Sequence, residues 1–531
     1  MKLIKFNQLV ISLITVGFIL LIAYFFSQLF LHEQKAVDGG LILSKKIIYP
    51  DNFSPLIDWI LGAWTSTYQL SALLFKLNWS ILNVSKFFIF IVALFYLLGV
   101  MSVTYAFTKS GVIAFFVSIS ILIFQKNFGD ADYPTLFFSP DTFGSLSLAL
   151  TTCIFGFVFL GYFFWVGFLS IFLICIHPVV GLWTSLVIFL SVIFIKFIIK
   201  EELDIKSLTY GAITGSFVTA VSFFVYLNEN YFPSSNIDFE ALNNYYKYWE
   251  GHRVQKDLHL EYLFKTLILF SLSIFSLIKL KKYLNKNVTF GIWSVLISIF
   301  FSILIYVTYK TINFPLWLTK IMPSRFIIMH SVIGWPLILG ILFLMINKYS
   351  EEKKISQYLA PFTIIFIVLF YSVQHYKTLL SLKNSYINNI EYQNVLLEKN
   401  HFWNTVKNTK FEGYILTSAS SGYTILRKSL KPILINPGDL DGVPYFPKTA
   451  DRLATIVEEI YGISFTNPPS EIRNSASISD GIIKLSFEKY SKEKWQQLSK
   501  DFNIGSVIVP VNWNINLTPF AKNNEFAFYI L

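Results

Sequence analysis

The sequence predicts a polytopic α-helical membrane protein of about 11 transmembrane helices, followed by a C-terminal soluble α/β domain. The 531-residue chain is 54% hydrophobic and only 14% charged, against roughly 25% charged residues in soluble domains. Apolar runs of roughly 17–25 residues, long enough to cross a bilayer, recur up to about residue 373. Beyond that point the runs shorten, and charged residues and Pro-Gly turns become frequent. We therefore expect a membrane domain over 1–373 and a second domain over 374–531.

The apolar runs set the number of spans. The first run follows Lys2 and Lys5 and exceeds the roughly 7–15 residues of a signal-peptide core, so we expect it to be a retained span. The stretch 162–199 is broken only by His177-Pro178, and a single kinked element is the alternative to two spans there. The expected spans lie at 8–31, 84–107, 111–126, 142–160, 162–177, 179–199, 208–227, 262–280, 288–309, 324–347 and 359–373.

Basic residues predict the orientation. Lysines gather in the short loops between spans, as in cytoplasmic loops under the positive-inside rule, whereas the longer loops carry acidic and aromatic residues. The same distribution accounts for the net charge of +11 and argues against nucleic-acid binding. The N-terminus is then cytoplasmic, and the segments outside are 32–83, 127–141, 228–261, 310–323 and the tail after 374.

The first outer loop is expected to contain helices lying on the membrane. Its segment "SPLIDWILGAWTSTYQLSALLFKLNWSILN" mixes apolar and polar residues, with Trp59, Trp64 and Trp79 suited to the membrane interface. A buried re-entrant hairpin is the alternative.

The tail alternates strand-length and helix-length segments. The predicted strands are "GYILTSA", "PILINPG", "IIKLSF", "GSVIVPV" and "FAFYIL", and helical patterns fall at about 391–408, 449–461 and 491–502. Such alternation predicts a small, mostly parallel α/β domain. "SASSGYTIL" is not a glycine-rich dinucleotide fingerprint, and Asp439 and Asp441 in "NPGDLDGVPYFP" are more typical of loop architecture than of a site.

Acidic residues beside the membrane are the candidates for chemistry. Asp38 lies a few residues beyond the first span, and Asp130 and Asp132 stand two apart in "GDADYP", so in an extended segment both point the same way. A carboxylate at this level can act as a general base toward an acceptor hydroxyl or hold a divalent cation such as Mg²⁺ or Mn²⁺. The structural alternative is a helix cap or a solvated loop charge.

Three basic or neutral donors are candidates for binding a phosphate. Lys320 and Arg325 flank Pro323 in "WLTKIMPSRFIIMH", and an arginine at a helix N-terminus makes a good phosphate clamp. His177 could bind a phosphate or shuttle a proton. The alternatives are snorkelling to lipid head groups for the two cations and simple packing for the histidine.

These features together resemble the GT-C superfamily of polytopic glycosyltransferases, and "GDADYP", "HPVVG" and "MPSR" look like a group of uncharacterised bacterial membrane proteins with this layout. The resemblance implies an inverting transferase in a bacterial inner membrane. It would use a polyprenyl-phosphate-linked sugar and a glycan or lipid acceptor at the outer face. Asp38 stands where the family's catalytic base would stand, and Arg325 where a residue binding the lipid phosphate could stand. No clear paired Asp follows the first span directly, which leaves the base and any metal open. The motif W-W-D-x-G is absent, so protein glycosylation is not expected.

Three other classes of function stay open at this point. A transporter or flippase of lipid-linked saccharide predicts ionisable residues deep within spans and inverted repeats, and neither is evident. An O-antigen polymerase or ligase would usually feature arginine-rich outer loops, which are sparse here. A non-catalytic assembly protein with the same fold is the third alternative.

Overall fold

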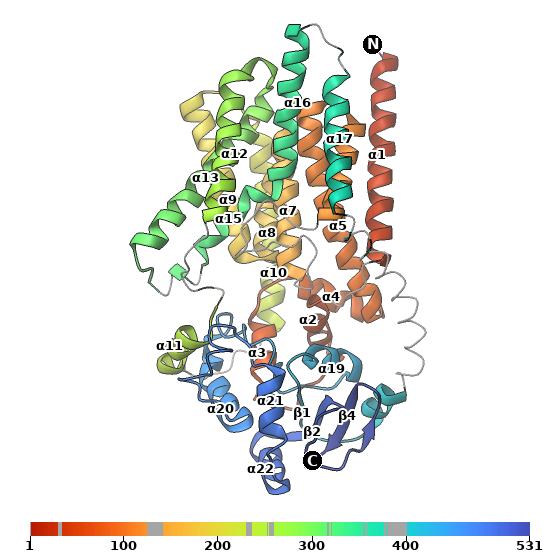
Figure 1. Ribbon diagram of the computed structural model, residues 1–531, viewed down its shortest axis with the longest axis vertical. Coiled ribbons are helices and arrows are strands. Elements are labelled where there is room, and N and C mark those ends of the chain that lie inside the picture. Colours follow the sequence, from red (N-terminus) through yellow and green to blue (C-terminus); the bar gives the residue numbers. More distant parts are fainter. Residues whose placement is uncertain are drawn as a thin grey trace.

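The protein consists of a long helical bundle with a smaller domain at one end (Figure 1). The N-terminus lies at the far end of the bundle, and the C-terminus lies in the small domain. This computed structural model confirms the predicted class, a polytopic helical membrane protein with a C-terminal domain. It describes residues 2–29, 34–51, 53–124, 142–229, 236–251, 253, 260–315, 318–319, 321–353, 356, 358–375, 377, 380 and 401–531.

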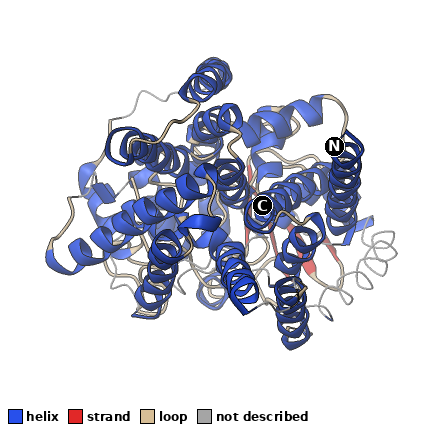
Figure 2. Ribbon diagram, turned by 90° about the horizontal axis from the view of Figure 1, so that it is seen from above, coloured by secondary structure: helices blue, strands red, loops and turns tan. Residues whose placement is uncertain are grey.

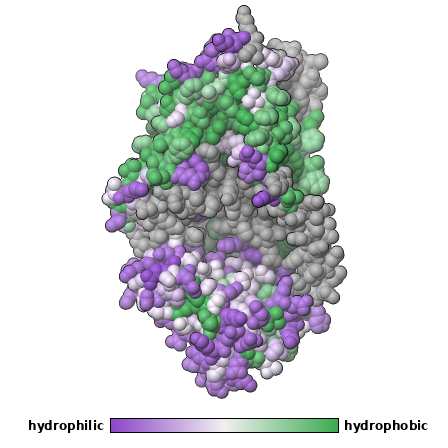
Figure 3. All heavy atoms as spheres, in the orientation of Figure 1, coloured by the Kyte–Doolittle hydropathy of each residue, from purple (hydrophilic) through white to green (hydrophobic). Residues whose placement is uncertain are grey.

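The described helices of the bundle match the predicted spans, and apolar residues cover much of the bundle on the face shown in Figure 3. Among the described residues, seven segments are long and apolar enough to cross a membrane: α5 (Ile81–Thr108), α7 (Thr142–Leu160), α9 (Pro178–Ile193) continued by η1 (Phe194–Ile199), α10 (Ile205–Glu229), α12 (Leu260–Lys279), α13 (Lys286–Thr311), and η4 (Ser331–Ile333) continued by α16 (Gly334–Lys353). Shorter apolar stretches are Ile14–Leu29 within α1 (Lys2–Leu29), Gly111–Ile123 within α6 (Gly111–Phe124), α8 (Phe163–Ile176) and α17 (Leu359–Gln374).

The stretch 162–199 forms two helices, so the single kinked element is excluded. Pro178 opens α9, where a missing backbone donor costs nothing, and the Val180 amide donates to His177 Nδ1 over 3.4 Å. The two helices double back on each other closely. A Cβ on Gly181 would lie 2.4 Å from the Ile174 nitrogen.

The predicted span 324–347 begins differently from expectation. A turn of 3-10 helix, η3 (Pro323–Arg325), leads into α15 (Phe326–Met329) and then into η4 and α16. The broken start is stabilised by neighbouring side chains: Ser302 donates to the Phe326 carbonyl over 2.8 Å, and Ser298 lies 3.3 Å from the buried His330 ring. Polar backbone at such a depth needs partners of this kind. Arg325 therefore lies in a short turn and not at the N-terminus of a long helix.

The first outer loop is helical, as predicted, with α2 (Ala36–Leu43), α3 (Pro55–Gly62) and α4 (Ser66–Lys76) placed between the bundle and the small domain (Figure 1). These helices, with α11 (Phe239–Tyr248), share one hydrophobic core with residues of 401–531. Trp59 is consequently buried, with its indole donating to Thr449 over 2.7 Å. The prediction that Trp59 lies at the membrane interface was wrong, because Trp59 packs into the small domain instead.

The small domain contains a four-stranded mixed sheet in the order β1-β2-β4-β3, lying on the side of α1 (Figure 2). The pair β1–β2 is parallel, whereas β2–β4 and β3–β4 are antiparallel. The strands are β1 (Tyr414–Thr417), β2 (Ile504–Pro510), β3 (Ala521–Lys522) and β4 (Phe526–Ile530). Residues 401–408 are helical, and the later helices are α19 (Gly422–Ser429), α20 (Ala450–Tyr461), α21 (Asp480–Phe487) and α22 (Lys492–Phe502).

Three details of the predicted α/β domain were wrong. The sheet is not mostly parallel, because the chain after β2 turns back locally, and such short connections join antiparallel strands. The segment "IIKLSF" is helical, with Ile483 and Phe487 four residues apart on one buried face. The segment "PILINPG" contributes only an isolated bridge between Ile433 and Ile415.

Candidate active site

Asp38 lies at the contact between the first outer loop and the small domain. It occupies the first turn of α2, and Arg427 in the last turn of α19 holds it with two hydrogen bonds of 2.7 Å, Nε to Oδ1 and Nη2 to Oδ2. The two side chains are only 3% and 7% exposed. Both carboxylate oxygens therefore already accept from a buried guanidinium, the geometry that arginine supports best.

A second ion pair lies one turn away on the same segment. Lys35 binds Asp439 at 2.8 Å, and the Tyr423 hydroxyl donates to Asp439 at 2.9 Å. Burial alone would raise the pKa of Asp439. The Lys35 ammonium and the hydrogen bonds to Asp439 outweigh burial and hold that pKa below its usual value. The Tyr423 ring lies 6.0 Å from Lys35 and 5.7 Å from the Arg427 guanidinium. Charges of alternating sign thus connect α2 to the small domain.

The glycines that follow Asp38 let α2 lie directly on α4. A Cβ on Gly39 would fall 2.3 Å from the Tyr68 ring, and one on Gly40 would fall 2.1 Å from the Ser71 hydroxyl. No larger residue fits at either position without displacing α4. This close packing fixes the direction in which Asp38 points.

Aromatic rings lead from this network toward His177. Phe143 lies 6.2 Å from the Tyr68 ring and 5.6 Å from the His177 ring, and 6.5 Å from Tyr445. Burial, together with the positive charges of Arg325 and Arg253, lowers the pKa of His177 to about 3. The imidazole is therefore neutral at pH 7. Because its Nδ1 accepts the Val180 amide, its proton resides on Nε2, which can donate to an anion.

Arg253 belongs to the same region but is strongly paired. It donates to Glu250 over 3.0 Å and also to Asp441, and its guanidinium lies 5.1 Å from the Tyr445 ring. The Glu250 side chain is fully buried. Arg325, half-buried in η3, contributes the other positive charge acting on His177.

The predicted site residues are thus partly brought together. His177 and Arg325 share one electrostatic environment, and Asp38 lies across Tyr68 and Phe143 from them. Asp130, Asp132 and Lys320 lie outside the described residues.

The loop that carries Asp130 and Asp132 rejoins the described chain at Thr142, next to the start of α2. The Thr142 hydroxyl donates to Gln34 over 2.9 Å, and the Ala36 amide donates to that hydroxyl over 3.1 Å. Thr142, the first described residue after 124, therefore contacts the start of α2 two residues before Asp38.

The described residues do not form a ready metal site. No group of three His, Cys, Asp or Glu side chains in that part of the chain is placed to hold an ion. The Asp38 oxygens are bonded to Arg427, and the nearby Asp439 carboxylate is bonded to Lys35 and Tyr423.

Sequence reasoning missed Arg427, Tyr423 and Arg253. One available signal was the spacing of Tyr423 and Arg427, four residues apart and hence on one helical face. Another was the pair Glu250 and Arg253 within an aromatic outer loop. Asp439 and Asp441 are bound by Lys35 and Arg253, consistent with the structural role the sequence suggested.

The fold and this junction define a class: a multi-pass helical membrane protein whose loops on one face share a core with a C-terminal domain. No family model matches the sequence, and no curated protein matches it. Among solved structures, the chain is similar to the oligosaccharyltransferase of Archaeoglobus fulgidus in the apo form, with a TM-score of 0.46 and 11% identity over 93% of this chain and 69% of that one. A likeness this distant does not assign an activity.

Proposed function

We propose that the protein is a membrane glycosyltransferase that moves a sugar from a polyprenyl-phosphate donor to a hydroxyl of a glycan or lipid acceptor. The observation that supports the proposal is the junction itself, where Asp38 lies on one side of Tyr68 and Phe143, and His177, under the positive charge of Arg325, lies on the other. This combination suits the transfer of a group away from a phosphate, and it agrees with the resemblance to the GT-C superfamily.

The reaction would be a single displacement with inversion at the sugar C1. A carboxylate takes the proton of the acceptor hydroxyl while the oxygen of that hydroxyl bonds to C1. The bond between C1 and the phosphate oxygen breaks, and the phosphate leaves with the electron pair. Arg325, Lys320 and the Nε2–H of His177 would stabilise the charge that develops on this leaving group.

Three carboxylates are candidates for the base. Asp38 is only 3% exposed and each of its oxygens accepts from Arg427, so we expect an acceptor hydroxyl to reach it only when Arg427 moves away. If Arg427 stays, the base is Asp130 or Asp132, and Asp38 then serves to position α2. A divalent cation, Mg²⁺ or Mn²⁺, would be held by Asp38 with one of these residues, but no step above depends on it.

The membrane placement is inferred from the positions of the chain ends and of the basic loops. We propose a bacterial inner-membrane location with the N-terminus in the cytoplasm and the small domain outside. The two ends of the chain lie at opposite ends of the bundle, and the basic short loops favour the N-terminal side as cytoplasmic.

The test is sugar transfer by the purified protein in nanodiscs, with a panel of labelled polyprenyl-phosphate sugars. Asp38→Asn, Asp130→Asn and Asp132→Asn are compared with Lys484→Gln, a control at an exposed position of α21. We expect the substitution of the true base to lower kcat by about 10²–10⁴-fold, and for Asp38→Asn this loss is measured below the lowered Tm of that variant. Arg325→Gln should lower kcat through weaker stabilisation of the leaving phosphate.

Two results would contradict the proposal. Full activity in all three Asp variants would remove every candidate base. A protein that carries labelled lipid between leaflets without transferring any sugar would be a flippase.

A further inference from the structure

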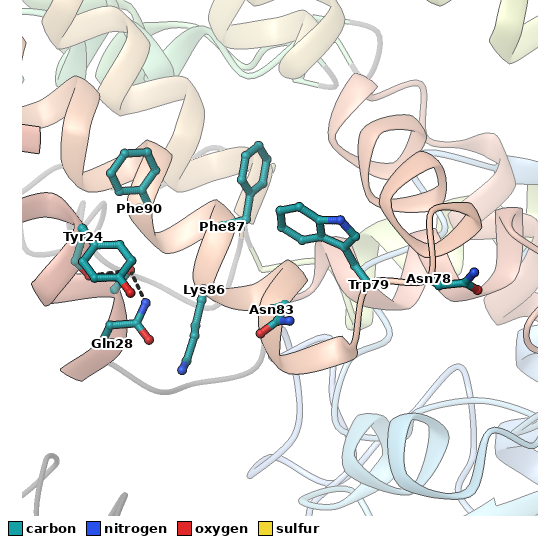
Figure 4. A pocket seen from close by; sticks show the side chains of 9 residues that line it. Tyr24, Gln28, Asn78, Trp79, Asn83, Lys86, Phe87 and Phe90 are labelled. Atoms are coloured by element: carbon teal, nitrogen blue, oxygen red, sulfur yellow. Dashed lines mark hydrogen bonds between the residues drawn. The ribbon is translucent and has the colours of Figure 1, made fainter.

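A cavity of about 450 Å³ lies where α1 ends and α5 begins (Figure 4). It is separate from the junction, since Ser85 faces inward and accepts the Gln34 amide, whereas the next residue, Lys86, lines the cavity. The lining residues are Tyr24, Ser27, Gln28, Asn78, Trp79, Asn83, Lys86, Phe87 and Phe90.

The aromatic residues that line the cavity suit the level of the lipid head groups. Tyr24 is 53% exposed and Trp79 is 39% exposed, and such amphipathic rings favour the level of the lipid head groups. Lys86 follows the first residue of α5 by five positions, about 7.5 Å along a helix axis. A lysine at this depth can extend its ammonium to the membrane surface.

The lining is polar at one end and aromatic at the other. The Lys86 side chain extends between Gln28 and Asn83, whereas Phe87 and Phe90 lie deeper along the helix (Figure 4). Within the part of the chain that the structure describes, Lys86 forms no ion pair or hydrogen bond. An anion is the natural partner for a lysine held this way, and the rings beside it suit an apolar chain.

We propose that this cavity binds an anionic, phosphate-bearing membrane lipid. The lipid phosphate would lie on Lys86, with the side-chain amides of Gln28 and Asn83 donating to its oxygens, and the hydrocarbon chain would follow Phe87 and Phe90 along α5. A free phosphate ion would gain only the contacts at the polar end, so the aromatic end favours a lipid. This site is distinct from the proposed donor site and does not depend on sugar transfer.

The test is native mass spectrometry of the full-length protein with phosphatidylglycerol, phosphatidylcholine or inorganic phosphate added. Lys86→Gln is compared with Lys310→Gln, a control at the exposed end of α13 outside the cavity. We expect phosphatidylglycerol to bind the wild type more tightly than phosphatidylcholine. Lys86→Gln should weaken that binding about fivefold, the contribution of one lysine near anionic lipid, and Lys310→Gln should leave it unchanged.

Three outcomes would overturn the site. Equal binding by Lys86→Gln and the wild type removes the lysine as a ligand. Equal losses in Lys86→Gln and Lys310→Gln indicate a general surface charge and no particular cavity. Inorganic phosphate binding that depends on Lys86, without retention of phosphatidylglycerol, indicates a free-anion site. Because the readout is lipid binding, failure here leaves the transferase proposal standing, and failure of sugar transfer leaves this one standing.

Discussion

The ion pair between Asp38 and Arg427 offers the sharpest test of how the two parts of the protein are joined. Asp38→Asn leaves a buried arginine without its counter-charge, and Arg427→Gln leaves a buried carboxylate without its own. Both side chains are less than a tenth exposed, so each single substitution should cost about 3–5 kcal/mol. The double variant removes both charges together, and it should therefore be more stable than either single variant.

The assay is thermal unfolding of the four proteins in one detergent, followed by tryptophan fluorescence, with Trp59 buried in the shared core. For a cooperative unit of roughly 150–250 residues, 1 kcal/mol corresponds to about 2–4 °C, so each single variant should lose roughly 6–20 °C. Lys484→Gln breaks a more exposed pair, 3.7 Å from Glu488, and should change Tm by no more than about 4 °C.

The result that would refute this reasoning is additivity. If the double variant loses the sum of the two single losses, the charges are not coupled and the pair does not hold the small domain in place. The double variant also separates two roles of Asp38. A stable but inactive double variant would point to Asp38 as the base, whereas a stable and active one would assign Asp38 to positioning alone.

Three further predictions concern the contacts around this junction and within the bundle. The pKa of Asp439 is held below its ordinary value of 3.8, so its charged form stabilises the fold above that pH and the contribution is lost as the pH falls below it. Thermal unfolding between pH 5 and 3 should therefore show a steeper fall in Tm for the wild type than for Asp439→Asn, and equal slopes would contradict the assignment. Gly39→Val places side-chain carbon against the Tyr68 ring and should destabilise α2 by about 1–3 kcal/mol, seen as faster proteolysis of the first outer loop than in the wild type. The Thr152 backbone lies 2.6 Å from a Cβ built on Gly99, because small residues allow such close helix approach. Gly99→Leu therefore forces α5 away from that backbone and should lower the Tm of the bundle. An unchanged Tm would mean that the contact does not contribute to stability.

The membrane spans could be predicted from the sequence because their signal is local. A run of apolar residues must become a helix in lipid, where every backbone group needs an internal partner. The α8–α9 turn at Pro178 followed from the same local logic. The failure at "IIKLSF" was also local in origin, because a six-residue apolar run fits a strand and a helix equally well. Its helical state depends on packing around Phe487.

The site was less predictable because its contacts join distant parts of the chain. Asp38 and Arg427 are 389 residues apart, and nothing in either local sequence indicates the other. Asp38 itself was found, since its position after the first span is a local feature. Arg427 could be located only once α19 was seen to pack against α2. The sheet order was hidden for a similar reason, because strand pairing depends on where the chain returns.

The placement of Arg427 has a mechanistic consequence for any substrate that reaches Asp38. The guanidinium that occupies both carboxylate oxygens belongs to the small domain, whereas the carboxylate belongs to a loop of the membrane domain. Exposing the carboxylate therefore requires either a new rotamer of Arg427 or a shift of α19. A ligand can drive such a change only if it binds the opened state more tightly than the closed one. Under the proposed function, the donor phosphate would meet that condition, because it could accept the hydrogen bonds that Arg427 gives up at Asp38. Donor binding and release of the carboxylate would then be a single coupled event.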